Sequence, residues 1–560
     1  MKTKVNWLEW GKASFEKAKN EDKLILLDLT AVWCHWCHVM DAASYSDDEI
    51  AKTINNDFVP IKVYIDKRPD LRERYNMGGF PSTVFLNPDG YVIAGDTYAP
   101  PERLKLMLEA VKGEYKKRKD EIRKNIQLIE EKTNKEKEIK EGDKINEVMI
   151  KDVLLSVEDN FDSFYGGFGL QPKFPVPEAL DLLFIQYQNT KSKKYLDMAL
   201  KTLDGMHNGI YDKIDFGFFR YSVTQDWKMP HYEKMLDTNA GLLRNYAVAY
   251  NITKMEKYKK IAEDTILYIT KFLSNQENGG FYGSQDADEE FYHSRQEERK
   301  NKKQPFVDKT IYVDWNSIMI SSYIKAGAAL NDDKTTDFAV KTVDFILENC
   351  YDSKNGVFHF YDGKANINGL LCDNIYFLNC LIDAYFMAQN QEYLEKINDL
   401  ADFVLNNFYD NKNPGFFDRL PKEDDLGTLK HRSKQFLENS FSAIVFLRLY
   451  FLTKNGKYRQ SAESTLLNFA DSYLNFGYFS AMYAVAAGML LNGEIKVDIV
   501  NRKGMVNACI SSINPRIVVN FIDKNKKKSV GYEIEGAYVC KGALCKGPIN
   551  DNKKLEEELT

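Results

Sequence analysis

The chain has few cysteines, no excess of basic side chains and few long apolar runs. Eight cysteines in 560 residues are too few for a scaffold built on disulfides, so a closely spaced pair is expected to cycle between thiol and disulfide. The net charge is −6, which leaves no broad positive surface and argues against nucleic-acid binding. The remaining composition, 44% apolar and 28% charged, is that of an ordinary globular protein.

Apolar segments of the kind used for export or membrane anchoring are also scarce. Charged side chains interrupt the first 20 residues, so we expect no signal peptide. The uncharged stretch 472–493 is long enough to cross a bilayer, but polar residues and glycines break it, which favours a loop followed by a buried helix. We therefore expect a cytoplasmic protein that does not bind a membrane.

Length and aromatic content limit the architecture. At 560 residues the chain is too long for one hydrophobic core, so more than one domain is expected. Aromatic side chains make up 13% of the residues, and they could line a carbohydrate groove or pack a large core.

The pair of thiols in Cys34-His35-Trp36-Cys37 is the strongest chemical signal in the sequence. It follows the mostly apolar run 24–33, where a buried strand is expected to lead into a helix. The N-terminus of that helix would stabilise a thiolate, so we predict that Cys34 is the nucleophile and the more exposed thiol, and that Cys37 resolves the mixed disulfide. His35, when protonated, would favour the thiolate further and make the pair a stronger oxidant.

Other interpretations of this pair are an inert buried pair, a metal site and covalent haem attachment. The haem interpretation arises because His38 completes a Cys-x-x-Cys-His pattern, but such attachment belongs to an exported compartment. We predict redox chemistry that needs no metal and no other cofactor. The residues expected to support the thiols are Trp33, His35, Trp36, Phe80 and Pro81.

Residues 1–112 are predicted to form one α/β domain with the element order of thioredoxin. Strands are expected at 24–31, 58–65, 83–86 and 91–94, and helices at 7–20, 34–44, 48–56 and 102–112. Pro81 precedes the third strand. We expect it to be cis and to lie opposite the thiols, where the neighbouring backbone could pair with an extended substrate.

Two segments flank the middle of the chain. Residues 113–145 are crowded with Lys and Glu, which predicts an exposed connecting helix with a flexible end near 141–143 and no function of its own. Residues 493–560 contain short apolar or alternating runs, which predict a small β-containing segment. Cys540 and Cys545 in that segment are expected to be free, although a second thiol pair or half of a metal site would have the same spacing.

Residues 146–492 are predicted to form an all-α (α/α)6 toroid of six hairpins. A glycine followed closely by an aromatic residue recurs between amphipathic stretches such as 258–273 and 392–407. These corners are Gly167-Phe168, Gly217-Phe218, Gly280-Phe281, Gly356-Val357-Phe358, Gly415-Phe416 and Gly477-Tyr478. One hairpin of two helices cannot bury its apolar stripe alone, so similar hairpins are expected to pack side by side and close into a ring, with the corners lining one mouth.

Several residues near these corners are candidates for sugar chemistry. Glycoside hydrolysis needs two carboxylates across the scissile bond, and epimerisation needs an acid/base pair on either face of the sugar. The candidates are Asp162, His231, Glu233, Asp237, Asp286, Asp288, Trp315 and Asp373. Structural roles are the alternative, because an aspartate at a helix start commonly caps the helix, a loop histidine commonly makes a local hydrogen bond, and a tryptophan can fill a core.

Taken together, the motifs of the chain resemble those of the spermatogenesis-associated protein 20 family over nearly its whole length. The matching stretches are 34–40, 79–86, 166–169, 172–175, 230–236, 286–288, 315–316 and 537–540. The resemblance implies an N-terminal thioredoxin-like domain and a helical domain of the six-hairpin glycosidase-like type. It implies no particular reaction.

The chain departs from the family pattern in its helical domain. The family usually has Tyr-Asp where this chain has Asp237-Thr238, so an acid is missing there unless Asp237 replaces it. The stretch between Asp288 and Trp315 is shorter than usual, and a Pro-Ser-Gly-Asn-Ser run is reduced to 438–440. These departures weaken inherited sugar chemistry more than they weaken thiol chemistry.

The favoured prediction is a thiol-disulfide oxidoreductase acting on a protein or small-molecule disulfide, with a toroid that binds a ligand or partner. The alternative is a carbohydrate-active enzyme, a glycoside hydrolase or sugar epimerase, whose thioredoxin-like domain senses redox state. A binding scaffold without turnover is a third, weaker hypothesis. A carbohydrate ligand is compatible with the first two.

Overall fold

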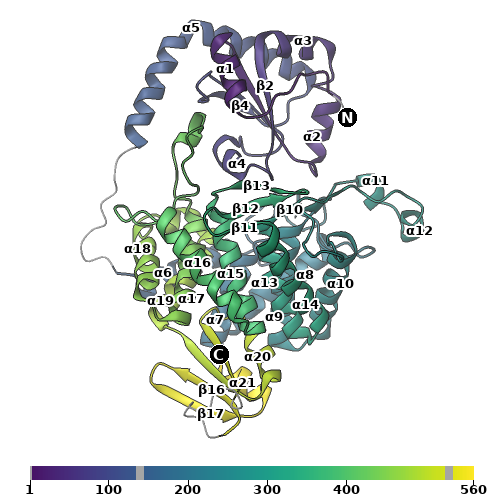
Figure 1. Cartoon of the computed structure of the whole chain (residues 1–560). Coiled ribbons are helices and arrows are strands. Elements are labelled where there is room, and N and C mark those ends of the chain that lie inside the picture. The colour runs from purple at the N-terminus through teal and green to yellow at the C-terminus, as the bar shows by residue number, and fades with distance from the viewer. Residues whose placement is uncertain (1–2, 134–143, 524–533, 560) are drawn as a thin grey trace.

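The computed structural model describes residues 3–133, 144–523 and 534–559. Figure 1 shows an α/β domain at the N-terminal end, a broad ring of helices in the middle and a small sheet at the end opposite the α/β domain. The fold class expected from the sequence is therefore confirmed: a thioredoxin-like domain, an (α/α)6 toroid and a β-containing C-terminal part.

The thioredoxin-like domain is built on a four-stranded sheet in the order β2-β1-β3-β4. Its strands are β1 (Leu24–Thr30), β2 (Phe58–Tyr64), β3 (Ser82–Leu86) and β4 (Val92–Asp96), and its helices are α1 (Lys12–Asn20), α2 (His35–Ala42), α3 (Asp48–Asp57), α4 (Pro69–Tyr75) and α5 (Pro101–Thr133). β1 pairs parallel with β2 and antiparallel with β3, and every residue of β1 is buried. An apolar central strand of this kind requires cover on both faces.

Helix α5 combines the predicted helix 102–112 with the connecting helix expected after residue 112. It continues past Lys112 to Thr133, with non-helical backbone angles at Arg118. The flexible end expected near 141–143 lies outside the described residues. The division of the chain at residues 112, 145 and 492 stays a prediction.

The toroid consists of two concentric rings of helices. The inner ring contains α7 (Pro177–Thr190), α9 (Leu236–Thr253), α13 (Val313–Leu330), α15 (Leu371–Ala388), α17 (Phe436–Thr453) and α19 (Ala481–Asn492). The outer ring contains α6 (Glu147–Asp159), α8 (Lys193–Gly209), α10 (Glu256–Phe272), α14 (Asp333–Asn349), α16 (Gln391–Asn407) and α18 (Gly456–Asn468). α19 packs on both α6 and α7, so the last inner helix closes the ring against the first two helices.

Each corner leads from an outer helix to an inner one, so the corners lie at the same end of the ring. A repeated contact fixes four of them: the fourth residue of an inner helix accepts the backbone N–H that follows the corner glycine. The acceptors are Asn239, Asn316, Asn374 and Asn439, at 2.8, 2.7, 3.0 and 2.6 Å from the N atoms of Phe218, Phe281, Val357 and Phe416. We call the end that carries the corners the mouth.

Short strands and turns cover the mouth. They are β5 (Tyr221–Ser222), β6 (Pro230–His231), β7 (Lys234–Met235), β8 (Ser284–Gln285), β9 (Val307–Asp308), β10 (Ile311–Tyr312), β11 (Tyr351–Asp352), β12 (Gly356–Tyr361), β13 (Ala365–Asn368) and η1 (Gly427–Lys430). Between β8 and β9 the chain makes an excursion through α11 (Glu289–Tyr292) and α12 (Gln296–Arg299). Figure 1 shows the thioredoxin-like domain seated on this mouth.

The C-terminal sheet has the order β15-β14-β16-β17. Its elements are β14 (Ile495–Val500), η3 (Lys503–Met505), α20 (Val506–Ile510), β15 (Ile517–Ile522), β16 (Gly536–Lys541), β17 (Leu544–Ile549) and α21 (Asn552–Glu558). The expectation that Cys540 and Cys545 are free is wrong, because they form a disulfide. They face each other in the register of the β16–β17 hairpin, a pairing that their sequence spacing alone does not reveal.

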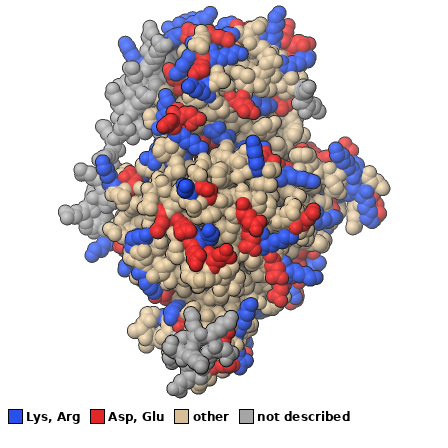
Figure 2. Space-filling view, viewed as in Figure 1, with Lys and Arg blue, Asp and Glu red and all other residues tan. Residues whose placement is uncertain are grey.

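Two segments are long and apolar enough to cross a membrane by composition, Phe436–Thr453 and Tyr473–Asn492. The first is inner helix α17, and the second combines η2 (Tyr473–Ser480) with inner helix α19. In the first segment 67% of the residues are buried and in the second 44%, so α17 and α19 pack within the ring while part of η2 is exposed. The face seen in Figure 2 carries positive and negative side chains interspersed over the α/β domain and the toroid.

Candidate functional site

The thiol pair occupies the start of helix α2. Cys34 is the N-cap residue, and the Cys37 backbone N–H donates a hydrogen bond to the Cys34 Sγ over 3.2 Å. The two residues form a disulfide in this structure. The Cys37 N–H also donates to the Cys34 carbonyl over 3.1 Å, and its approach to the Cys34 sulfur would stabilise a thiolate on that atom after reduction.

Both thiols are buried: Cys34 is 4% exposed and Cys37 is 3% exposed, so the two hardly differ in exposure. The reason is the toroid: the guanidinium of Arg220 lies 4.3 Å from the ring centre of Trp33, and His38 Nε2 lies 3.8 Å from Asp286 Oδ1. The segment that carries the thiols therefore faces the mouth.

The predicted supporting residues surround the pair. Trp33 is buried, its ring lies edge-on to that of Phe80, and the Phe80–Pro81 peptide bond is cis as expected. Trp36 is 43% exposed and packs against Tyr98.

Strand β1 carries a buried carboxyl, that of Asp28, which the sequence motifs did not indicate. Asp28 pairs with Lys62 Nζ at 3.1 Å, and the same ammonium contacts Asp41 of α2 at 2.6 Å. Burial raises the pKa of Asp28 to about 6, against the opposing effect of Lys62. Asp28 is the one charged residue in the apolar run 24–30, which was the available signal.

A chain of hydrogen bonds crosses from the thiol segment into the toroid. Trp33 Nε1–H donates to Asp66 Oδ2 over 2.7 Å, and the Asp66 carbonyl accepts from His359 Nε2 over 2.7 Å. His359 Nδ1 lies 2.9 Å from Asp373 Oδ1. Because a backbone carbonyl can only accept, His359 carries its proton on Nε2, and the bond to Asp373 needs a second proton.

The charges along this chain follow from burial and from the neighbouring groups. Burial raises the pKa of Asp66 to about 7, against the opposing effect of Arg72. Burial alone would lower the pKa of His359, but the Asp373 carboxylate raises it to about 9. An imidazolium beside Asp373 is therefore the expected state at neutral pH.

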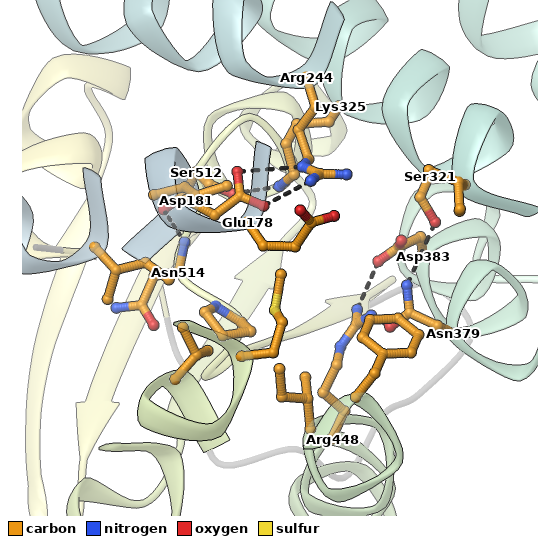
Figure 3. A pocket seen from close by; sticks show the side chains of 18 of the residues that line it. Glu178, Asp181, Arg244, Ser321, Lys325, Asn379, Asp383, Arg448, Ser512 and Asn514 are labelled. Carbon is orange, nitrogen blue, oxygen red and sulfur yellow. Dashed lines mark hydrogen bonds and ion pairs between the residues drawn. The ribbon is translucent and has the colours of Figure 1, made fainter. Parts of the chain in front are cut away.

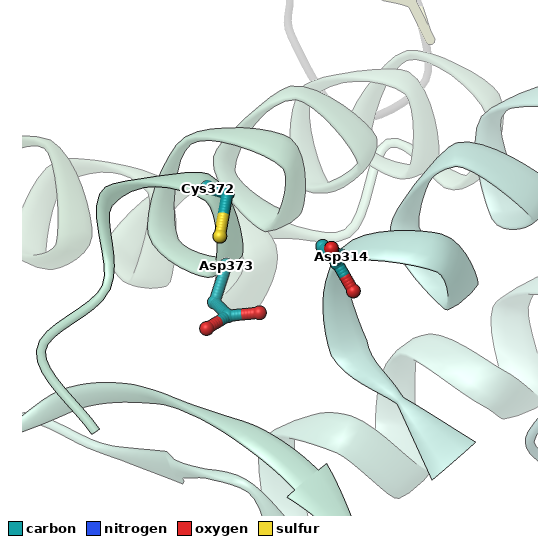
Figure 4. Close-up of side chains that lie close together, drawn as sticks. All are labelled: Asp314, Cys372 and Asp373. Atoms are coloured by element: carbon teal, nitrogen blue, oxygen red, sulfur yellow. The ribbon is translucent and has the colours of Figure 1, made fainter. Parts of the chain in front are cut away.

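Asp373 also belongs to a cluster with Asp314 and Cys372, shown in Figure 4. One ligand atom from each lies within 4.8 Å of the others, so the cluster could hold a divalent cation or share a proton. Burial raises the pKa of Asp314 to about 6, and Asp373 Oδ2 is buried without a hydrogen-bond partner among the described residues. Asp314 and Cys372 were missed because both stand at starts of inner helices that are distant in sequence.

A second group of predicted residues lies beside the thiols. His231 Nδ1 is 3.5 Å from Glu233 Oε1, and Asp286 approaches His38. Burial raises the pKa of Asp286 to about 6, against the opposing effect of His38. The mouth thus carries two separate groups of titratable residues.

Other predicted residues have structural surroundings. Asp162 pairs with buried Lys173, which lowers the pKa of Asp162 to about 2 although burial acts in the opposite direction. Asp288 caps α11 by accepting the Phe291 N–H over 2.9 Å. Trp315 is 8% exposed and packs on Tyr312, so it fills the core. Asp237 stands at the start of α9, where burial raises its pKa.

A cavity of about 390 Å³ lies along the ring, bounded on one side by α20 and β15. Figure 3 shows two ion pairs on its wall, Asp181 with Arg244 and Asp383 with Arg448. The rest of the wall is mostly apolar. The cavity was missed, although charged residues within otherwise apolar inner helices were a signal for it.

Comparisons with known proteins match both halves of the chain. Residues 1–134 match the family model Thioredox_DsbH, described as a protein of unknown function, DUF255. Human spermatogenesis-associated protein 20 is 25% identical over 99% of this chain and 90% of its own length. Thioredoxin-1 of Drosophila melanogaster is 38% identical over 66 residues, 12% of this chain and 59% of its own length.

Among solved structures, the cellobiose 2-epimerase of Spirochaeta thermophila has the same toroidal fold. It matches with a TM-score of 0.50 and 13% identity over 61% of this chain and 96% of its own. At that identity the match shows the fold alone. The match to human spermatogenesis-associated protein 20 along nearly the full chain confirms the resemblance to this family that the sequence motifs predicted.

Proposed function

We propose that this protein is a thiol-disulfide oxidoreductase whose reactive pair is Cys34 and Cys37. The observation that carries the proposal is the hydrogen bond from the Cys37 backbone N–H to the Cys34 sulfur at the start of α2. Cys34 is then the nucleophile and Cys37 the resolving thiol. A cytoplasmic location belongs to the same proposal, because a reducing compartment lets the pair cycle.

The burial of Cys34 restricts which disulfides can reach it. The toroid contacts Trp33 and His38 on the two sides of the pair, so a substrate reaches the sulfur through the mouth or after the thioredoxin-like domain moves away. We propose that the toroid selects the substrate in this way. A thioredoxin-like relative over part of the chain supports the chemistry but not the choice of substrate.

The test is disulfide reduction by the full-length protein with dithiothreitol as electron donor. Cys34→Ser should remove turnover, and Cys37→Ser should form a stable mixed disulfide that mass spectrometry detects, because the resolving thiol is gone. Cys350→Ser, at a buried free cysteine, is the matched control and should turn over normally. Equal turnover by wild type and Cys34→Ser would contradict the proposal.

A second candidate function is acid/base chemistry on a carbohydrate in the toroid. It is favoured by titratable groups at the mouth whose pKa values are spread apart: Asp314 at about 6, and Glu438 raised by burial to about 8. The solved structure with the same toroid is named an epimerase of cellobiose. Incubation with cellobiose and mannose, followed by chromatography, tests this function, and products that persist in Asp314→Asn would exclude Asp314 from it.

A further inference from the structure

Arg220, Glu233 and Asp286 form a row at the mouth, each directly beside a short strand: Arg220 precedes β5, Glu233 precedes β7 and Asp286 follows β8. The Arg220 backbone N–H donates to the Glu233 carbonyl over 2.8 Å, which joins the first two segments of the row. Lys234 pairs with Gln285 in the antiparallel β7–β8 ladder, so Glu233 and Asp286 stand opposite each other one step further along. Opposite residues of such a pair direct their side chains to the same face. The two acids therefore face the same side, and the backbone of Arg220 is bonded to that of Glu233.

The row lies against the thiol segment. Trp33, directly before Cys34, stacks on the Arg220 guanidinium at 4.3 Å. His38, directly after Cys37, lies 3.8 Å from Asp286. The thiol pair is thus held between the two ends of the row.

The polar groups of the row are only partly partnered: Glu233 Oε1 lies 3.5 Å from His231 Nδ1, and Asp286 Oδ1 lies 3.8 Å from His38 Nε2. The Arg220 side chain makes no hydrogen bond or ion pair with a described residue. It stacks on Trp33 and Tyr221 and acts electrostatically on Asp66 and Asp237. Glu233 Oε2 and Asp286 Oδ1 are buried and have no hydrogen-bond partner in the described part of the chain. Glu233 is 2% exposed, so water does not readily supply the missing bond. Buried polar atoms are almost always paired, so unpaired donors and acceptors around a reactive sulfur indicate a bound ligand.

We infer that the row binds the amino-acid end of a small zwitterionic disulfide, with its carboxylate on Arg220 and its ammonium on Glu233 and Asp286. This inference rests on the proposed thiol-disulfide function. It is consistent with the burial of Cys34, which a small molecule entering the mouth can reach more readily than a strand of a folded protein. Guanidinium–carboxylate and ammonium–carboxylate contacts are strong when charged groups pair away from water.

The reaction is a balanced two-electron exchange. The Cys34 thiolate attacks one substrate sulfur, the substrate S–S bond breaks, and the departing thiolate takes a proton. The Cys37 thiol then loses its proton and attacks the Cys34 sulfur, which releases the second substrate thiol and leaves the Cys34–Cys37 disulfide. A dithiol reductant restores the pair.

The test compares three disulfides with the pre-reduced full-length protein. Cystine carries both charges, cystamine only the ammonium groups, and dithiodipropionate only the carboxylates. Each rate is divided by the rate of the same disulfide with dithiothreitol, which removes differences in intrinsic reactivity. We expect cystine to exceed each of the others by at least about tenfold, because it alone makes both charged contacts.

Two variants assign the contacts. Arg220→Gln should slow cystine and dithiodipropionate but not cystamine, and Asp286→Asn should slow cystine and cystamine but not dithiodipropionate. Arg432→Gln is the matched control, because Arg432 also stacks on an aromatic ring, at 3.7 Å from that of Phe417. It should leave all three rates unchanged.

The outcomes separate this inference from the proposed function. Normalised rates that are equal for the three disulfides, or insulin reduced as fast as cystine, would overturn the inference and leave the oxidoreductase function standing. Reduction of none of them, insulin included, would overturn both. The wild-type comparison alone decides the inference if a variant fails to fold.

Discussion

At the scale of single residues, one contact can set the charge of a buried group. His359 is 1% exposed and lies between the Asp66 carbonyl and the Asp373 carboxylate. The same histidine joins the two domains, because Asp66 belongs to the thioredoxin-like domain and Asp373 to the toroid. The protonation of His359 therefore bears on how firmly the domains dock.

We expect a pH-dependent stability from His359. Its folded-state pKa of about 9 lies above the ordinary value of 6.5, so its stabilising effect is complete below about pH 6.5 and is lost as the pH rises through 9. The unfolding free energy of wild type should exceed that of His359→Gln by up to about 3 kcal/mol at low pH, and the difference should shrink above pH 9. Urea titrations across this range measure it. A difference that does not vary with pH would contradict the assignment.

Site residues could be predicted from the sequence where their interaction partners are close to them along the chain. Cys34 and Cys37 could be identified because motif and helix start are contiguous. Asp314 and His359 could not, since their partners come from separate inner helices and from the other domain. The burial of both thiols could not be predicted for the same reason: no local pattern shows that the toroid covers them.

At the scale of elements, the corners explain how helices of similar length are held in register. Asn316 accepts the Phe281 N–H and donates to the carbonyls of Phe281 and Tyr312, at 3.0 and 2.7 Å. Glycine is needed at these corners as well: Gly217 has a φ of 72°, and a Cβ there would lie 2.4 Å from the Tyr268 ring. An asparagine amide makes the same contact at three other corners, so four of the corners are held by one type of hydrogen bond.

Replacing one of these amides should be costly. Asn316→Ala leaves the buried N–H and carbonyl of Phe281 without the amide as partner, so we expect the unfolding free energy to fall by about 3 kcal/mol or more. Asn398→Ala removes an exposed amide that bonds only to the Leu394 carbonyl, and it should cost under about 1 kcal/mol. Urea-induced unfolding of both variants tests this, and similar losses would contradict the role of the corner amide.

Periodicity and turn residues predicted several elements near their observed bounds, including β1, α10 and α16. Local patterns failed where partners are remote. α5 was predicted as two helices because the composition changes near residue 112, but a charged helix can be exposed and still continue the one before it. The Cys540–Cys545 disulfide was missed because it depends on the register of a hairpin.

At the scale of the whole molecule, the thioredoxin-like domain is held on the mouth by buried charge. Arg74 pairs with Asp418 at 2.7 Å, with both side chains 9% exposed, and Arg74 also donates to the His431 carbonyl. Tyr75 Oη accepts the Thr428 N–H over 3.0 Å. These contacts keep the thiol segment turned toward the toroid.

Loosening this interface should expose the thiols. In Arg74→Ala we expect the reduced pair to be alkylated by iodoacetamide at least about tenfold faster, because removing one partner of a buried ion pair weakens docking by more than the 1.4 kcal/mol that tenfold requires. Arg103→Ala breaks an exposed Arg–Asp pair within the thioredoxin-like domain and serves as the control. Unchanged alkylation in Arg74→Ala would show that docking does not limit access.

The closure of the ring by α19 against α6 and α7 has a consequence during synthesis. The earliest helices of the toroid must wait for nearly the last one to leave the ribosome before their apolar faces are covered. A chain that ends before residue 481 would leave apolar side chains of α7 and α17 exposed. It would therefore be a target for chaperones and proteases.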